Sequence, residues 1–510
     1  MYALTVATFS CSVYNLHMPA YIRKVKSKSG ATSVQIEYKR GRERTGITHI
    51  GTAHNEMELK LLCALAYSKI HEGQISLDLA DQDSKLDAKL KKSFSGVLWS
   101  ALESVYCTLG FETMQDTVFK QLVLARIIEP ASKFDTIRIL DGLGLDAPTN
   151  TALHRCLKRV ISKDYRSAVS AACFDKSKSS SLMLVLYDVT TLYFEIQRDD
   201  GYRKPGLSKE RRLEPQITVG LLVDSTGFPL EVKSFEGNKA EVHTIIPVLV
   251  GFKERHGLKD ITVTADAAML SAGNIEVLER LGYHYVIGSR LTKTPYEIEA
   301  MLSGNEVFAD GQIFESQKAV TINGERMKRR EIFQYRQKRA ALDLSNIDKT
   351  VAKAQKIIDK KAGIKRNRFL KIMGDVREIN QALVDEARLR AGIKGYITDP
   401  TIPAQQVIDA YHQLFQVEKS FRMSKSDLKA RPIFHHERES IEAHLTIVFT
   451  SLAIARYIEA HTGLSIKKFV KTLEPVRTGI VTVGDSAFEL KPEVPPDVAD
   501  LLRKLLEIIA

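Results

Sequence analysis

The sequence predicts a protein of the α+β or mixed α/β class, with one sheet that contains both antiparallel and parallel strands. Three observations lead to this prediction. Between about 179 and 295, apolar runs of strand length and helical periodicities follow in the order β-β-β-α-β-α-β. Helical periodicity dominates the stretch before them, from about 55 to 178, and about 100 residues separate them from a last helix. The 510 residues, 44% hydrophobic and 27% charged, are ordinary for a globular protein of several domains.

A small β-meander is predicted near the N-terminus, from Ala20 to about Ala53. The stretch TSVQIEYKR alternates apolar and polar residues, and GITHIGT follows a charged turn. Helices are predicted from there to about 178, with a break at Pro130. Helical pairs that carry scattered Arg and Lys are compatible with a DNA-binding bundle, and equally with any packed all-α domain.

The predicted sheet begins after KSKSSS. A run of apolar residues, Leu182–Thr190, is bounded by polar ones and is expected to be a buried strand. Two strands follow, joined at the turn Asp224–Gly227, then a helix that ends at Gly257. The strand DITVTAD, a helix up to Gly282 and the strand YHYVIGSR complete the order. We expect the first three strands to be antiparallel neighbours and the later ones to return through helices and pair in parallel.

The segment from about 295 to 400 is expected to interrupt this core with an insertion that contains a strand, REIFQYRQK, a long helical run through Leu389 and a final strand, GIKGYITDP. It is also basic. Between Lys318 and Lys371 there are 17 Lys and Arg against 5 Asp and Glu, a net +12 that equals the excess of the whole chain. A localised excess favours a nucleic-acid partner, and we expect this segment to follow the DNA backbone without reading bases. Its candidate DNA-binding residues are Lys328, Arg329 and Arg330. The alternative is a solvated basic loop.

The stretch YHQLFQVEKSFRMSKSDL, Tyr411–Leu428, is predicted to be one helix. At about 100° per residue, one stripe of it carries an acid, two cations and a phenol: Tyr411, Leu414, Glu418, Arg422 and Lys425. The neighbouring stripe is apolar and is expected to face a core: Ala410, Leu414, Val417 and Phe421. The alternative is a solvated face on which Glu418 pairs with Arg422 and Lys425.

Three acids fall where elements of this core end or cover it. Asp188 lies at the end of the first buried strand, Asp266 at the end of DITVTAD, and Glu418 on the last helix. Three carboxylates at one edge of a sheet repel one another unless a cation neutralises them. Oxygen ligands without His or Cys favour Mg²⁺ or Mn²⁺. Taken singly, an aspartate at the end of a strand is more often a turn former or a helix cap.

Several motifs, in order, resemble one family. YDVTTLYFE resembles the first-aspartate motif of bacterial insertion-sequence transposases, and TVTADAAMLS resembles the second. The last helix resembles the Y-x2-R-x3-E-x6-K signature of the IS-four superfamily, in register at Tyr411, Glu418 and Lys425. GLSKERRLEPQITVGLLVD, FEGNKAEVHT and RPIFHHERESIEAHL are similar to segments of its branch with long insertions. The resemblance covers roughly residues 20–465. It departs from the signature at Leu414, which stands at the arginine position.

The resemblance implies an RNase H-like core and a DDE transposase, which cuts DNA at the ends of an insertion sequence and joins the 3′-OH to target DNA. It implies that Asp188, Asp266 and Glu418 are catalytic and bind two Mg²⁺ (or Mn²⁺) ions, while Tyr411 and Lys425 hold phosphates of the DNA end. Arg422 is the candidate to replace the cation missing at Leu414. The alternatives are an RNase H-like nuclease and a DNA-binding remnant that has lost catalysis.

The implied partner is double-stranded DNA, both the terminal inverted repeats and the target, bound by a homodimer. The expected domains are 1–95, β-meander and helix; 96–178, helical and DNA-binding; 179–295, first part of the core; 296–400, basic insertion; 401–465, second part of the core with the helix of Glu418; and 466–510, C-terminal tail. Five widely spaced cysteines indicate neither a disulfide framework nor a zinc site, which favours a reducing compartment, the bacterial cytoplasm and nucleoid. No apolar run is expected to span a membrane. Met18 is an alternative start to Met1.

Overall fold

The chain forms two compact units, Met1–Lys91 with Ile480–Phe488, and Lys92–Gly479 with Glu489–Ala510. The computed structural model describes residues 20–26, 31–40, 43–53, 56–70, 88–177, 184–195, 200–206, 214–258, 261–267, 269, 272–289, 298–299, 301, 307–322, 325–361, 363, 365–373, 376–399, 402–483 and 486–506. Met1, Cys11 and Met18 lie outside these ranges, and so do all of the predicted linker KLDAKLKKS before Ala88 and the last four residues of KSKSSS.

The first unit contains the predicted β-meander. Strands β1 (Ala20–Lys26), β2 (Thr32–Arg40) and β3 (Glu43–Ala53) pair antiparallel in that order, and helix α1 (Glu56–Ile70) packs against them. Its small core is formed by the alternating residues of β2 that face the helix, Val34 and Ile36, together with Ala66.

Another three-stranded sheet has the order β16-β15-β4, with β4 at Ala88–Phe94, β15 at Thr478–Val483 and β16 at Ser486–Leu490.

The second unit begins with five helices, as the periodicity predicts. They are α2 (Gly96–Thr108), α3 (Thr117–Ile128), α4 (Lys133–Gly142), α5 (Asn150–Ser162) and α6 (Tyr165–Ser177). Asp116 explains how three of them hold together. Its carboxylate caps α3 by accepting from Phe119 N at 3.1 Å, and also accepts from Arg159 of α5 at 2.8 Å and from the Tyr165 hydroxyl of α6 at 3.0 Å.

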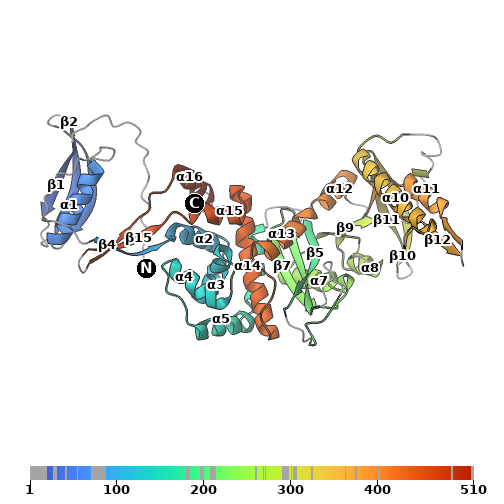
Figure 1. Ribbon diagram of the computed structural model, residues 1–510, viewed down its shortest axis with the longest axis horizontal. Helices are drawn as coiled ribbons and strands as arrows, with labels where there is room; N and C mark the ends of the chain where they lie inside the picture. The colour runs from blue at the N-terminus through green and yellow to red at the C-terminus, as the bar shows by residue number, and fades with distance from the viewer. Residues whose placement is uncertain are drawn as a thin grey trace. The chain divides into compact units, whose positions relative to one another are not determined.

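An eight-stranded mixed sheet forms the centre of the second unit, in the order β10-β11-β14-β9-β8-β5-β6-β7 (Figure 1). The strands predicted first are β5 (Leu184–Tyr193), β6 (Gln216–Asp224), β7 (Pro229–Glu236), β8 (Thr262–Ala265) and β9 (His284–Ser289). The first three pair antiparallel, and β8 and β9 join β5 in parallel, as expected. Helices α7 (Ile245–His256) and α8 (Ala272–Arg280) supply the crossovers.

The insertion extends this sheet, which the sequence did not indicate. Its elements are β10 (Ile313–Ile322), β11 (Glu325–Tyr335), α10 (Gln337–Ile358), β12 (Leu370–Met373), β13 (Val376–Ile379), α11 (Gln381–Leu389) and β14 (Ile393–Thr398). Strand β14 pairs antiparallel with β9, and β11 with β14. The long helical run predicted through Leu389 is two helices with the hairpin β12-β13 between them, packed around Phe369 and Val384.

The predicted last helix, Tyr411–Leu428, is also two helices, which corrects the single stripe that the sequence predicted. Helix α12 (Ala404–His412) ends and α13 (Phe415–Ser426) begins after a turn at 413–414. Helix α12 contacts β8, β9 and β14, whereas α13 contacts β5 and β6. Both lie on the sheet face opposite to that of α7: Thr190 of β5 lines a cavity with α13, while Tyr187, three residues earlier, bonds Thr244 at the start of α7.

Helix α14 (Arg438–Thr462) runs through the core of the second unit and contacts α3, α5, β7 and α13. Its length and composition would allow it to span a membrane, contrary to the expectation from the sequence. However, the most apolar 18-residue stretch of this helix is 94% buried within the protein. The apolar character of α14 therefore reflects its packing. Helices α15 (Ile466–Leu473) and α16 (Pro496–Leu506) pack against it.

Candidate active site

Two of the three predicted acids lie side by side. In the parallel pair β5-β8, Tyr187 lies opposite Ala265. The residue that follows each of them is an aspartate: Asp188 after Tyr187, and Asp266 after Ala265. Neighbouring strands are about 4.8 Å apart, and residues at matching positions face the same side of a sheet. Asp188 is half-buried and Asp266 exposed, with Asp266 Oδ1 accepting from Ala267 N at 2.7 Å. The fold therefore places both carboxylates on one face of the sheet, at the edge where β8 ends. Asp188 lies within β5, which continues to Tyr193, and not at the end of that strand as the sequence predicted.

The third acid, Glu418, is exposed on α13, the helix that covers β5. Two side chains hold α13 to the turn between β6 and β7. Ser420 donates to the Gly227 carbonyl at 2.7 Å, and the buried Arg456 of α14 donates to the same carbonyl at 3.2 Å and to Gln416 of α13 at 2.9 Å. Glu418 forms no ion pair with Arg422, as far as the described residues show, so the alternative of a self-paired charged face is not seen.

The donor set is compatible with a hard divalent cation, because it consists of carboxylate oxygens only. Among the residues that the structure describes, however, no three His, Cys, Asp or Glu side chains gather closely enough to hold a metal ion. Asp188 and Asp266 are brought together, and Glu418 lies on the neighbouring helix without completing a three-acid cluster. Of the three carboxylates that were predicted to converge, those of Asp188 and Asp266 thus lie together.

Tyr411 lies at this edge of the sheet, as predicted, although on α12. Its hydroxyl donates to Asp266 Oδ1 at 3.2 Å. The ring has room because residue 288 is glycine: a Cβ there would lie 2.7 Å from the Tyr411 hydroxyl oxygen. Burial and the Asp266 carboxylate raise the pKa of Tyr411 above its ordinary value, so the phenol stays protonated and can donate.

Lys394 is a site residue that sequence analysis missed. It lies on β14 of the insertion, with its Nζ 3.4 Å from the Tyr411 hydroxyl and 4.8 Å from the centre of the ring. Burial and the nearby Arg339 guanidinium lower the pKa of Lys394. The available signal was a single lysine inside the apolar strand sequence IKGYIT, but only the pairing of β14 with β9 shows where that lysine lies.

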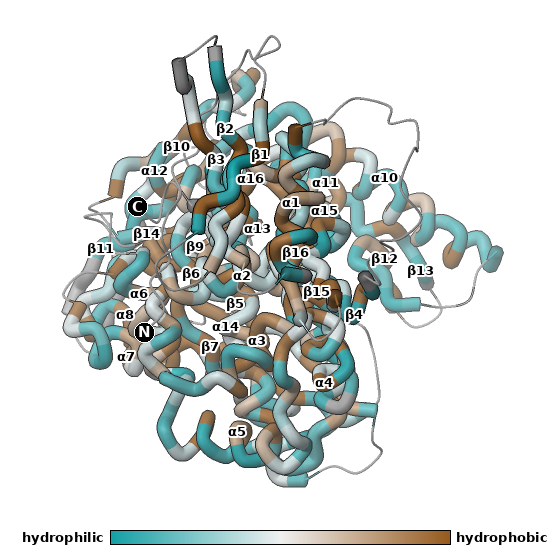
Figure 2. Tube along the Cα trace, turned by 90° about the vertical axis from the view of Figure 1, so that its left-hand side faces the viewer, coloured by the Kyte–Doolittle hydropathy of each residue, from teal (hydrophilic) through white to brown (hydrophobic). Residues whose placement is uncertain are grey.

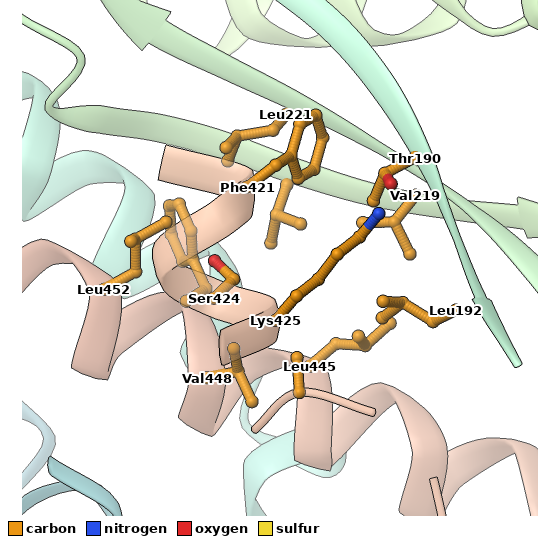
Figure 3. A pocket seen from close by; sticks show the side chains of 13 residues that line it. Thr190, Leu192, Val219, Leu221, Phe421, Ser424, Lys425, Leu445, Val448 and Leu452 are labelled. Atoms are coloured by element: carbon orange, nitrogen blue, oxygen red, sulfur yellow. The ribbon is translucent and has the colours of Figure 1, made fainter. Parts of the chain in front are cut away.

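The two candidate DNA-binding cations on α13, Arg422 and Lys425, have different surroundings. Arg422 is exposed, whereas the side chain of Lys425 extends toward Thr190 through an apolar cavity (Figure 3). Phe421 and Leu221 lie on one side of the Lys425 side chain and Leu445 on the other. The ammonium group thus lies beside β5, on the sheet face that also carries Asp188, instead of projecting into solvent.

Leu414, at the arginine position of the signature, precedes α13 and is half-buried against the main hydrophobic core. The predicted apolar stripe is largely confirmed, since Ala410, Val417 and Phe421 are buried. Leu414 thus belongs to that stripe, and the break between the helices separates it from the polar one.

The three cations chosen from the insertion need a correction, because only Lys328 is exposed. Arg329 donates to both carboxylate oxygens of Glu279 at 2.9 and 3.0 Å, and the two side chains are only 12% and 8% exposed. Arg330 donates to Glu315 at 2.6 Å and to the Ile402 carbonyl. These arginines hold the insertion to the core, so at most one of the three is available to DNA.

The strand order β7-β6-β5-β8-β9, two acids side by side on adjacent strands and a third on the covering helix are consistent with an RNase H-like core. Comparison with known families then identifies it more closely. The Transposase DDE domain family matches residues 179–454, more than half of the 510 residues, and the chain belongs to that family.

Other comparisons are less close. A solved structure with similarity to this chain is the "Cryo-EM structure of piggyBac transposase synaptic complex with hairpin DNA", at 10% identity and a TM-score of 0.35, covering 74% of this chain and 70% of that one. No curated protein sequence matches the chain.

Proposed function

We propose that the protein is an active, metal-dependent DNA transposase of an insertion sequence, in the long-insertion branch of the IS-four superfamily. It cuts at the element ends and joins the 3′-OH to target DNA. The observation that carries this proposal is the parallel register of β5 and β8, which puts Asp188 beside Asp266 on the face covered by α13. The membership of the chain in the DDE family supports it.

In this proposal Asp188 and Asp266 hold divalent cations, Mg²⁺ or Mn²⁺, and Glu418 joins them when DNA is bound. The ions would activate the attacking oxygen and stabilise the leaving one. Tyr411 keeps its hydroxyl on Asp266 and so orients that carboxylate. Arg422 and Lys328, both exposed, contact phosphates from α13 and β11. Lys425 approaches the DNA end from the apolar cavity beside β5.

The same proposal includes the assembly and the place of action. A homodimer would bind two terminal inverted repeats at once, in the bacterial cytoplasm and nucleoid, and then capture target DNA. Sizing of the protein with and without end DNA tests the dimer.

The direct test is Asp188→Asn with labelled terminal-repeat DNA. A neutral amide is a poor ligand for a hard cation, so cleavage and strand joining in Mg²⁺ or Mn²⁺ should be lost, by roughly 10³-fold or more, while end binding stays within about twofold. Asp500→Asn, which removes an equal charge from the C-terminal helix α16, should cleave like wild type. Normal cleavage by Asp188→Asn would overturn the assignment.

A further inference from the structure

A polar cleft lies inside the insertion, between α10 and α11, and encloses about 370 Å³. These two helices lie next to each other (Figure 1). One wall is a single face of α10, on which Arg339, Asp343, Asn346 and Thr350 follow at helical spacing. The opposite wall contains Arg368, which precedes β12, and Arg390 at the end of α11. Three arginines and one aspartate thus line the cleft, a net charge of about +2.

The three arginines are placed to receive an anion. Arg368 is exposed and its guanidinium lies 5.4 Å from the Phe369 ring centre, a stacking contact that leaves its N–H edge available. Arg339 is 46% exposed and pairs with Asp343 at 3.4 Å, which is a long contact. Arg390 is only 8% exposed and is held by Glu386 at 3.3 Å. A planar guanidinium offers parallel donors that suit phosphate oxygens.

The cleft also continues from the acid edge of the sheet. Asp266 bonds Tyr411, Tyr411 contacts Lys394, and Lys394 lies close enough to Arg339 for that guanidinium to affect its pKa. Ile393, the residue before Lys394, lines the cleft itself. Lys394 and Arg339 thus bring positive charge to the region between this edge of the sheet and the cleft. Figure 2 shows that much of α10 is hydrophilic (teal).

We infer that this cleft binds phosphates of the DNA backbone and holds the DNA strand that leaves the active site. This inference rests on the proposed function. It adds a second DNA contact of the insertion, the cleft of Arg339, Arg368 and Arg390, to that of Lys328 on β11, where Arg329 and Arg330 are paired within the protein. As a contact to phosphates, the cleft is expected to bind DNA irrespective of the base sequence.

The test compares two double variants of the full chain. Arg339→Gln with Arg368→Gln removes two cations from the cleft, while Lys349→Gln with Lys353→Gln removes two exposed cations of α10 that do not line it. Binding to duplex DNA is measured over a range of salt concentrations, without divalent metal. The cleft variant should lower the slope of log K against log salt by about 1.8, at about 0.9 per phosphate contact, for any DNA sequence. The control should change it by less than about 0.9.

Equal slopes for the cleft variant and wild type, or equal losses in both double variants, would overturn the inference. Inorganic phosphate at matched ionic strength is the second probe. If it raises the melting temperature of wild type but not of the cleft variant, while the DNA slope is unchanged, the cleft binds a free anion and the DNA assignment is wrong.

Should the melting temperature of the double variant fall, the single variant Arg368→Gln is expected to lower the slope by about 0.9, since no ion pair of Arg368 is seen among the described residues. The binding assay contains no metal, so it tests the cleft even if the protein cannot cut DNA. If the cleft variant has an unchanged slope and, in a separate assay with Mg²⁺, cuts DNA normally, the proposed function stands and the cleft assignment is refuted.

Discussion

Neighbouring residues of the transposase signature have different surroundings in this fold. Tyr411 donates to Asp266, Lys425 crosses an apolar cavity beside β5, and Leu414 packs against the core. The arginine expected at 414 would need a polar environment that this position does not offer. Lys394, from a strand of the insertion, contacts Tyr411 and brings a cation to the same edge of the sheet. Position 414 before α13 therefore carries no cation, whereas β14 supplies one, Lys394.

Leu414→Arg tests whether this position is part of the core. A guanidinium there would be placed against apolar side chains, which should lower the free energy of unfolding by about 1–3 kcal/mol and leave end binding no tighter. Thermal melts and an end-binding assay measure both. Leu414→Met conserves volume and should cost less than about 1.5 kcal/mol. A fully stable Leu414→Arg protein that binds ends more tightly would show that the position faces DNA.

At the scale of elements, α13 depends on a neighbour that lies far away in the sequence. Arg456 of α14 donates to the carbonyls of Gly227 and Thr226, to Gln416 and to Glu459. This one buried side chain fixes the start of α13 to the β6-β7 turn, and with it the position of Glu418. Hydrogen bonds to the backbone of the core therefore help to position α13, in addition to its buried side chains Val417 and Phe421.

Arg456→Met should release α13. Carbonyls that lose their donor inside the protein cost about 1–3 kcal/mol of unfolding free energy, and cleavage should fall more than DNA binding because Glu418 moves with the helix. Chemical unfolding and cleavage assays give the two values. Lys419→Gln removes the other cation on Glu459, a partly exposed one, and should change stability by less than about 1 kcal/mol. Equal melting of Arg456→Met and wild type would contradict this role for the arginine.

For the molecule as a whole, stability below neutral pH should depend on a pair of imidazoles. The rings of His435 and His444 lie 5.4 Å apart, and His444 is buried on α14 with its Nε2 3.2 Å from the Ala430 carbonyl oxygen. Burial, with Lys133 and Arg126 nearby, lowers the pKa of His435 to about 3, and burial lowers that of His444 well below its ordinary value. Both therefore stay neutral in the folded protein.

The unfolded chain takes up protons at these histidines below about pH 6.5, while the folded protein does not, so folding stability should fall as the pH falls from about 6.5 toward 3. The loss is at most about 1.4 kcal/mol per pH unit for each group, and it is absent above about pH 7. Unfolding at pH 7.5 and at pH 5 measures it. His435→Gln should lose less stability between these values than wild type does. The exposed His243→Gln serves as control, and an equal loss in all three proteins would refute the assignment.

Much of the fold follows from the sequence because it depends on local patterns. Alternation between polar and apolar residues predicts β1 to β3, helical periodicity predicts α2 to α6, and short apolar runs predict β5 to β9 in the observed order. The closeness of Asp188 and Asp266 follows from that order and from the right-handed crossovers, without any knowledge of side-chain contacts, although Asp188 lies within β5 and not at its predicted end. These are properties of each segment and of its immediate neighbours.

Only the tertiary structure decided the rest, because it depends on partners that are distant in the chain. Neither Gly nor Pro marks the break at 413–414, which lies where α12 leaves β9 and α13 begins over β5. The pairing of Arg329 with Glu279, fifty residues away, removes a cation that sequence counts as free. Lys394 contacts Tyr411 because β14 pairs with β9. A strand pairing of this kind depends on packing over the whole sheet, so it cannot be predicted from a local sequence pattern.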